Sequence, residues 1–248
     1  MLEATDIRVR FGGNTAVDGV SLRLGRGEVV GLVGPNGSGK TSFLNAICGI
    51  VPATGSLTLR GVPVPMGRPL KVRAAGLSRT FQTPQVFDDL TCVENVMLSG
   101  ERFRRTGFLG ATLGRRRMLR DEHERTERAR RALATVGLDG MWDRPAKGLA
   151  YGQARYLEIA RALAGEPAVI ALDEPSAGLN AEETNRLAEL LRSVSEQGVS
   201  LLIVDHKIEY LSRICDRIDV LELGRLIASG PPERVFQDPA VIEAYLGT

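Results

Sequence analysis

The chain has 248 residues, of which 43% are hydrophobic and 25% are charged, and its 32 basic and 30 acidic residues leave a formal net charge of +2. This composition excludes a disordered chain, and the near balance of charge gives no overall attraction to nucleic acid or to anionic lipid. The length suits one large domain, or a main domain with a smaller subdomain.

The cysteines and the hydropathy pattern bear on the cellular compartment. Cys48, Cys92 and Cys215 are scattered, odd in number and without metal-ligand spacing, so we expect free thiols in a reducing cytoplasm. The longest apolar runs, at 168–172 and 199–204, are much shorter than the roughly 20 residues of a membrane-spanning helix. The charged N-terminal residues argue against a signal peptide. If the protein works at a membrane, we expect another subunit to hold it there.

The first hundred residues predict strands on both sides of a Gly-rich turn. A helix is expected from about Lys40 to Cys48, and a second one at 91–98, where Thr91 and Glu94 predict a capping box. The run EVVGLVG is continuously apolar, which is typical of a strand buried on both faces of a parallel sheet. The expected strands and extended segments are 2–10, 20–33, 56–60 and 77–82.

The composition changes between residues 101 and 131, a stretch with 11 arginines, no lysine and 5 acidic residues. Its second half predicts a solvated helix, because acids precede arginines at i,i+4 spacing. The pairs are Asp121/Arg125, Glu124/Arg128 and Glu127/Arg131. Two interpretations stay open: an exposed helical insertion held by these pairs, and a docking surface for a partner or for lipid headgroups.

Helices and strands alternate in the C-terminal part. Asn180 and Glu183 predict a capping box at the start of one helix. Alternation of this kind indicates an α/β fold with a mostly parallel core. The expected helices are 152–164, 181–197 and 206–213, the expected strands are 168–172 and 199–204, and 217–223 with 225–229 would form a pair around Gly224.

The strongest motif is GPNGSGKT at residues 34–41, which fits GxxxxGK[ST], follows an apolar strand and opens a helix. Glycines let successive backbone N–H groups turn toward one concave side, and the helix N-terminus adds positive potential. Lys40 can reach the β- and γ-phosphates and the Thr41 hydroxyl can ligate Mg²⁺. The motif therefore predicts binding of a nucleotide phosphate. Its candidate residues are Gly34, Asn36, Gly37, Ser38, Gly39, Lys40, Thr41 and Ser42.

A second motif, AVIALDE, ends the expected strand 168–172 with two acids. Ligands of α/β proteins bind at the carboxyl ends of the strands, so Asp173 would lie beside the phosphate loop and suits Mg²⁺. Glu174 is better placed to polarise an attacking water as a general base. The alternative is an acidic pair that merely caps a core strand at the surface.

A third segment, LAYGQAR at 149–155, precedes the acidic pair by about 20 residues. In this order the motifs resemble those of the ATP-binding subunits of ABC transporters, whose signature loop is usually written LSGGQ, and the resemblance covers nearly the whole chain. It implies a P-loop NTPase core with a mostly parallel sheet at 1–82 and 165–248, an antiparallel β subdomain, and a helical subdomain at about 83–164. It also implies ATP and Mg²⁺ as ligands and ATP hydrolysis as the activity.

The resemblance assigns further residues. Gln82 looks like the family's Q-loop glutamine, 177–180 like its D-loop, His206 like its switch histidine, and Phe11 like the aromatic residue that stacks on adenine. Each has a plainer alternative: core or strand-edge packing for Phe11, a solvated surface group for Gln82, and a locally satisfied helix residue for His206. The implied catalytic residues are Glu174, His206 and Lys40, the implied metal ligands are Thr41, Gln82 and Asp173, and the implied signature contacts to nucleotide are Tyr151, Gly152 and Gln153.

Three positions depart from the common pattern. Ala150 replaces the signature serine and so lacks a hydroxyl contact to the γ-phosphate, which usually matters by about 1.5–3 kcal/mol. Tyr151 replaces the first signature glycine and narrows the room for close backbone approach. Asn180 replaces the D-loop aspartate and puts the inter-subunit contact at that site in doubt.

The segments LAYGQ, VDHKIEYLSRICDRI and AYLGT, together with the Arg-rich insertion, look like the ATPase of branched-chain (hydrophobic) amino acid importers. The resemblance implies a second ATP-binding subunit (a homologous chain or another copy), transmembrane permeases, an indirect extracytoplasmic solute-binding protein, no nucleic acid, and a peripheral location on the cytoplasmic face of the inner membrane. Two alternatives are an importer of urea or short-chain amides from the same branch and a soluble non-transport ABC ATPase. A P-loop kinase or GTPase and a non-catalytic regulatory subunit are further alternatives.

Overall fold

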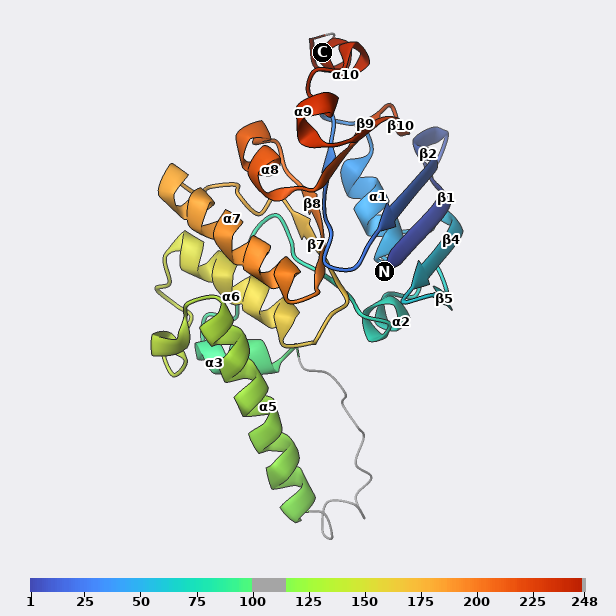
Figure 1. Ribbon diagram of the computed structural model, residues 1–248. Helices are drawn as coiled ribbons and strands as arrows, with labels where there is room; N and C mark the ends of the chain where they lie inside the picture. Colours follow the sequence, from blue (N-terminus) through green and yellow to red (C-terminus); the bar gives the residue numbers. More distant parts are fainter. Residues whose placement is uncertain (100–114, 247–248) are drawn as a thin grey trace. The chain divides into compact units, whose positions relative to one another are not determined.

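The computed structural model describes residues 1–99 and 115–246 (Figure 1). The chain forms two compact units: unit 1 contains residues 1–82 and 167–248, and unit 2 contains residues 83–166. Among the described helices, none is long and apolar enough to cross a membrane.

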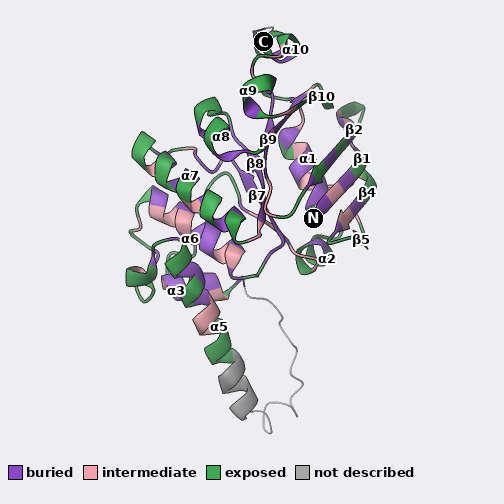
Figure 2. Cartoon of the chain, viewed as in Figure 1, coloured by how far each residue is buried: buried purple, intermediate pink, exposed green. Residues whose placement is uncertain are grey.

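A six-stranded sheet is the centre of unit 1, with the order β10-β9-β3-β8-β7-β6. Every neighbouring pair is parallel except β9 with β10, so the predicted mostly parallel core is confirmed. All residues of β3, β7 and β8 are buried, because the sheet is covered on both faces (Figure 2). The strands are β3 (Val29–Val33), β6 (Leu77–Arg79), β7 (Val169–Asp173), β8 (Ser200–Val204), β9 (Arg217–Glu222) and β10 (Arg225–Gly230).

A second, antiparallel sheet has the order β2-β1-β4-β5, which confirms the expected β subdomain. The prediction of one strand over 20–33 is wrong. A turn interrupts it, in which the Gly25 amide donates to the Glu28 carboxylate at 2.6 Å and Gly27 has a φ of 67°. The strands are β1 (Leu2–Phe11), β2 (Asn14–Leu24), β4 (Thr54–Leu59) and β5 (Val62–Val64).

Helix α1 (Lys40–Ile47) lies between the two sheets (Figure 1). Its Phe43, Leu44 and Ile47 are fully buried in one hydrophobic cluster with side chains of both sheets. Val30 and Leu32 of β3 belong to this cluster, because alternate residues of a strand face the same side. Burying each large apolar side chain stabilises the fold by about 1.5–3 kcal/mol, so α1 and the strand that precedes it are held firmly.

The remaining helices of unit 1 are α2 (Pro69–Ala74), α7 (Ala181–Glu196), α8 (Ile208–Ile214), α9 (Pro232–Val235) and α10 (Pro239–Leu246). The capping box at α7 is confirmed: Asn180 Oδ1 accepts the Glu183 amide at 2.9 Å, and Glu183 Oε2 accepts the Asn180 amide at 3.0 Å. Helix α8 begins two residues later than predicted, because Asp205 Oδ1 accepts the amides of His206 and Lys207.

Unit 2 is a cluster of helices in which α3 (Cys92–Met97), α5 (Arg115–Thr135) and α6 (Tyr151–Leu163) pack on one another, with a short 3-10 helix η1 (Asp139–Met141). The predicted capping box of Thr91 and Glu94 is confirmed. The buried Asn95 amide bonds the carbonyls of Phe87, Leu90 and Thr91 and so fixes the turn before α3.

Helix α5 confirms the helix predicted for the second half of 101–131, whereas the first half and the Asp121/Arg125 pair lie outside the residues whose side chains are described. Glu127 Oε1 lies 3.9 Å from Arg130 Nη1, so this acid pairs at i,i+3 and not with Arg131. Arg128 Nε donates to the backbone carbonyl of Glu124 at 3.4 Å. Some of the contacts that stabilise α5 therefore differ from the i,i+4 ion pairs that the sequence spacing predicted.

Candidate functional site

Four neighbouring parallel strands of unit 1 end at one edge of the sheet. The segment 34–41 follows β3, His206 follows β8 by two residues, Asp173 ends β7, and Gln82 follows β6 by three residues. The register pairs Asp173 with Val204 and Val204 with Leu32, so these ends are level. The edge therefore gathers predicted site residues that are far apart in the sequence.

The segment after β3 forms a tight loop that only glycine allows at its ends. Gly34 and Gly39 have φ values of 144° and 103°. A Cβ at Gly34 would lie 2.0 Å from the Leu221 carbonyl oxygen, and one at Gly39 would lie 2.3 Å from that of Ala16. The Ser38 amide donates to the Pro35 carbonyl at 3.2 Å, and α1 begins at Lys40. The loop thus presents a helix N-terminus toward the sheet edge, a favourable place for an anion.

Lys40 is 6% exposed and folds back over this loop. Its ammonium group donates to the Gly34 carbonyl at 2.7 Å and to the Pro35 carbonyl at 2.9 Å. Burial lowers the pKa of Lys40, and the charges of Glu174 and Asp173 oppose that shift. A phosphate would compete with the two carbonyls for the hydrogens of the ammonium group.

Glu174 is the centre of a hydrogen-bonded group of three side chains. Its Oε2 accepts from Gln82 Nε2 at 2.7 Å, and its Oε1 lies 3.0 Å from His206 Nε2. Glu174 also has a left-handed φ of 46°, and its amide donates to the Val204 carbonyl at 2.7 Å. A non-glycine residue in this region costs of order 1–3 kcal/mol, and such residues cluster at active sites.

Asp173 is 6% exposed and ion-paired with Arg79, whose Nη2 lies 2.8 Å from Oδ2. Arg79 also bonds the Asn45 side chain. Within the described residues no group of three or more His, Cys, Asp or Glu could hold a metal. Mg²⁺ is usually held by one or two protein oxygens together with phosphate and water, so the oxygen donors of Asp173 and Thr41 fit it.

A supporting network fixes the loop that carries His206. Asp205 accepts the Ser176 amide at 3.0 Å and its hydroxyl at 2.9 Å, besides the His206 amide at 2.7 Å. Lys207 Nζ donates to the carbonyls of Ser176 and Leu179. The segment 176–180 and the histidine are therefore tied together.

Phe11 ends β1 and is 50% exposed, so it is not a core residue, whereas the alternative of strand-edge packing stays open. Its exposed face is available to stack on a planar ligand. Asn180 caps helix α7, as described above, and this structural role explains the residue without any part in catalysis.

The signature segment lies in unit 2, at the first turn of α6. Gly152 is buried, and Gln153 Oε1 accepts the Ala150 amide at 3.0 Å. The Tyr151 hydroxyl lies 3.4 Å from Arg155 Nη2, and Arg155 is fully buried in an ion pair with Glu158 at 2.9 Å. Gln153 and Tyr151 thus both contact groups of their own unit.

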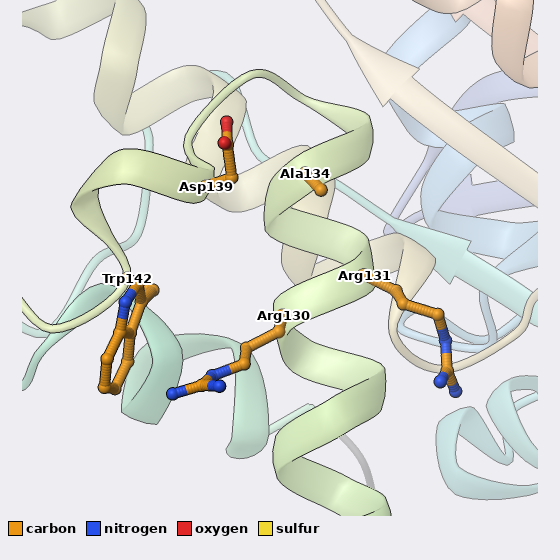
Figure 3. A pocket seen from close by; sticks show the side chains of 5 residues that line it. All are labelled: Arg130, Arg131, Ala134, Asp139 and Trp142. Carbon is orange, nitrogen blue, oxygen red and sulfur yellow. The ribbon is translucent and has the colours of Figure 1, made fainter.

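Unit 2 also carries a pocket of about 310 Å³ lined by Arg130, Arg131, Ala134, Asp139 and Trp142 (Figure 3). The guanidinium carbon of Arg130 lies 4.0 Å from the centre of the Trp142 ring. None of the predicted site residues lines it.

Sequence reasoning missed Arg79, Asp205 and Tyr245. Tyr245 accepts the amide of Gly34 at 2.9 Å, so that N–H faces a side chain of α10. Their partners lie at sequence separations of 94, 29 and 211 residues. Neither motif spacing nor periodicity indicates contacts between residues so far apart in the sequence. Arg79 lies only three residues before Gln82, but no local pattern indicates which residue it would pair with.

Comparison with known proteins agrees with this geometry. The family model for ABC transporters matches residues 17–177, and the model described as branched-chain amino acid ATP-binding cassette transporter matches residues 225–248. The high-affinity branched-chain amino acid transport ATP-binding protein BraF of Pseudomonas aeruginosa is 39% identical over 249 residues, covering 100% of this chain and 98% of that protein.

Two solved structures have the same fold. A nucleotide-free ATP-binding cassette from an ABC transporter is 31% identical with a TM-score of 0.86, and the ADP conformation of MJ1267, an ATP-binding cassette of an ABC transporter, is 30% identical with a TM-score of 0.85. Each comparison covers 100% of this chain and 99% of the other. The chain therefore belongs to the ABC transporter family of ATP-binding cassettes, whose members bind ATP and hydrolyse it to power transport.

Proposed function

We propose that this chain is the ATP-hydrolysing subunit of an importer of branched-chain or related hydrophobic amino acids. The observation that carries the hydrolytic part is the group around Glu174, which joins the ends of β6, β7 and β8 beside the phosphate loop. The solute class is supported by the name of the Pseudomonas relative and by the match of residues 225–248.

The loop 34–41 would bind the nucleotide phosphates. The amides of Gly34 and Ser38 already have partners, so the other backbone amides between Asn36 and Ser42, together with the N-terminus of α1, would face the phosphate oxygens. Lys40 would exchange its two carbonyl partners for β- and γ-phosphate oxygens. Phe11 would stack on the adenine from its exposed position.

Thr41, Asp173 and Gln82 would hold Mg²⁺, which when bound neutralises charge between the β- and γ-phosphates. Asp173 would keep one oxygen on Arg79 while the other ligates the ion. The neighbouring arginine also compensates the buried carboxylate when no cation is present.

Glu174 would take a proton from the attacking water, with its carboxylate aimed by Gln82 and His206. His206 and Lys40 would stabilise the negative charge on the γ-phosphate oxygens. Because phosphoryl transfer needs mainly positioning and charge stabilisation, the fixed strand ends account for most of the catalysis.

The mechanism is completed by a second ATP-binding chain, a homologue or another copy. Tyr151, Gly152 and Gln153 of one chain would face the phosphates held by the other, so that ATP joins the two and its hydrolysis separates them. Transmembrane permeases would receive this motion through the residues after Gln82, and a solute-binding protein outside the membrane would deliver the amino acid. The chain would then lie on the cytoplasmic face of the membrane.

The test of the hydrolytic role is Glu174→Gln in the reconstituted transporter. We expect turnover to fall about 10²- to 10⁴-fold, as is usual when a general base is removed, with Mg·ATP binding retained. His123→Gln, a change in the exposed part of α5, serves as the control and should leave turnover unchanged. Near-normal hydrolysis in the Glu174→Gln protein would exclude this residue as the base.

The solute class is tested by uptake in cells that lack this chain and are complemented with the wild type or with Lys40→Ala. Uptake of labelled leucine restored only by the wild-type chain would support the proposal. Restored uptake of urea without leucine uptake would contradict it.

A further inference from the structure

The C-terminal helix α10 makes a direct contact with the phosphate loop inside unit 1. The Tyr245 hydroxyl accepts the backbone amide of Gly34 at 2.9 Å, across 211 residues of sequence. Val241 and Ala244 of the same helix are buried, at 2% and 4% exposure, and α10 packs against β10. The helix is therefore anchored by its own apolar residues as well as by the tyrosine.

Gly34 is the point at which the loop leaves the sheet. Its φ of 144° is one that other residues rarely adopt, and a side chain there would collide with the Leu221 carbonyl, so no other residue type fits. Its carbonyl accepts from Lys40 at 2.7 Å while its amide is held by Tyr245. Any rotation of the backbone at Gly34 would therefore move both the start of the phosphate loop and the Lys40 ammonium group, which bonds the Gly34 carbonyl.

The other end of the loop is held in a similar way. The Gly224 amide donates to the Ser38 carbonyl at 3.0 Å, and the Gly224 carbonyl accepts the Asp18 amide at 2.8 Å. A Cβ at Gly224 would lie 2.9 Å from the Ala16 carbonyl oxygen, which explains the glycine in this turn between β9 and β10. The loop is thus bonded at Ser38 by a backbone group and at Gly34 by a side chain.

We propose that Tyr245 is a positioning residue for nucleotide binding: its hydroxyl holds the Gly34 peptide so that the phosphate loop is formed before the nucleotide arrives. Because the hydroxyl bonds the Gly34 peptide at the start of the loop, Tyr245 acts through the loop. The proposal rests on the proposed phosphate-binding role of 34–41 and adds to it a function for the segment matched by the second family model.

The experiment compares the full-length wild-type chain with Tyr245→Phe, which removes only the hydroxyl. Equilibrium binding of Mg·ATP and Mg·ADP, amide hydrogen exchange and thermal unfolding are measured on each protein. Ile242→Ala is the matched control, since Ile242 is an exposed residue of the same helix. Lys40→Ala tests separately whether the loop binds phosphate at all.

We expect Tyr245→Phe to weaken both nucleotides about 2- to 10-fold, the range that a net hydrogen bond of ordinary strength gives. Exchange of the Gly34 amide should accelerate, whereas exchange at Leu32 within β3 and the melting temperature should match those of Ile242→Ala. In the assembled transporter the KM for ATP should rise by a similar factor with kcat retained, because saturating nucleotide organises the loop.

Unchanged affinity would overturn the proposal. A fall in affinity that accompanies faster exchange throughout β3 and a lower melting temperature would also overturn it, because the tyrosine would then be only a packing residue. If Lys40→Ala binds nucleotide as well as the wild type does, the phosphate-binding role of the loop fails instead, whatever Tyr245→Phe shows.

Discussion

Each unit of the protein contains an arginine–carboxylate pair with little solvent exposure, and the two pairs differ in how the chain forms them. In unit 1, Arg79 and Asp173 lie on neighbouring strands, 94 residues apart, with side-chain exposures of 10% and 9%. In unit 2, Arg155 and Glu158 lie one turn apart on α6, with exposures of 0% and 6%. The first pair is at the edge that gathers the candidate site, and the second is on α6, where Arg155 is the last residue of the segment LAYGQAR.

The difference separates two uses of a buried charge. A carboxylate at a strand end is placed by the sheet, and its arginine compensates its charge there. A pair within one helix is local, and Arg155 of this pair also lies 3.4 Å from the Tyr151 hydroxyl of the same helix. Removing one member of a buried pair leaves a charge without its partner, so the more enclosed pair should matter more for stability.

The largest stability effect should come from Glu158→Ala. It leaves the fully buried Arg155 guanidinium without this carboxylate, and we expect the free energy of unfolding to fall by about 3–5 kcal/mol. Asp173→Ala should lower it by only about 1–3 kcal/mol, because Arg79 keeps its hydrogen bond to Asn45. Urea unfolding of both variants measures the difference. A larger loss for Asp173→Ala would reverse the contrast.

A smaller effect is expected at the two helix caps, one in each unit. Thr91→Ala in unit 2 and Asn180→Ala in unit 1 each remove a side-chain oxygen that accepts an amide of the first turn, at 3.3 Å and 2.9 Å. Each should cost about 1 kcal/mol of unfolding free energy. Thermal or urea unfolding measures this loss of unfolding free energy. A loss near zero at either site would show that the capping box there does not contribute to stability.

Asn180→Asp should leave stability nearly unchanged, because Asp and Asn cap helices about equally well. The substitution restores the aspartate that is usual in the D-loop. If the inter-subunit contact at this position is weakened by asparagine, ATP turnover of the assembled transporter should rise while the melting temperature of the single chain stays the same. Unchanged turnover would show that asparagine serves this contact equally well.

The smallest effect is a pH dependence at the cap of α3. Hydrogen bonds from the Thr91 hydroxyl and from the Thr91 amide lower the pKa of Glu94. A carboxyl whose pKa is lowered on folding stabilises the native state above its unfolded pKa, and this contribution is lost as the pH falls through the folded value. Wild type and Glu94→Gln should therefore differ more at pH 7 than at pH 3 in urea unfolding. A constant difference would contradict the linkage.

The sequence predicted those features that depend on backbone geometry or on local spacing. The glycines of 34–41, the apolar strand that ends in Asp173 and Glu174, and the two capping boxes are patterns within a few residues. The boundaries that failed, at 25–28 and at His206, depend on side chains that bond backbone amides: Glu28 to Gly25, and Asp205 to His206 and Lys207.

Contacts between distant segments could not be predicted in the same way. Arg79 with Asp173, and Tyr245 with Gly34, form only after the sheet has brought their elements together. The strand-end motif named Glu174, and the resemblance named Gln82 and His206. The hydrogen bonds among them follow from the order β3-β8-β7-β6, which no local pattern contains.

The left-handed backbone of Glu174 has a consequence for laboratory evolution. Glycine adopts that conformation without penalty, whereas other residues pay about 1–2 kcal/mol for it. If the strain outweighs the hydrogen bonds of Glu174 to Gln82 and His206, a library selected for heat resistance alone should enrich Glu174→Gly, and under the proposed general-base role these proteins would be inactive. The same library selected for growth on imported amino acids should retain glutamate, so the two selections would diverge at this one codon.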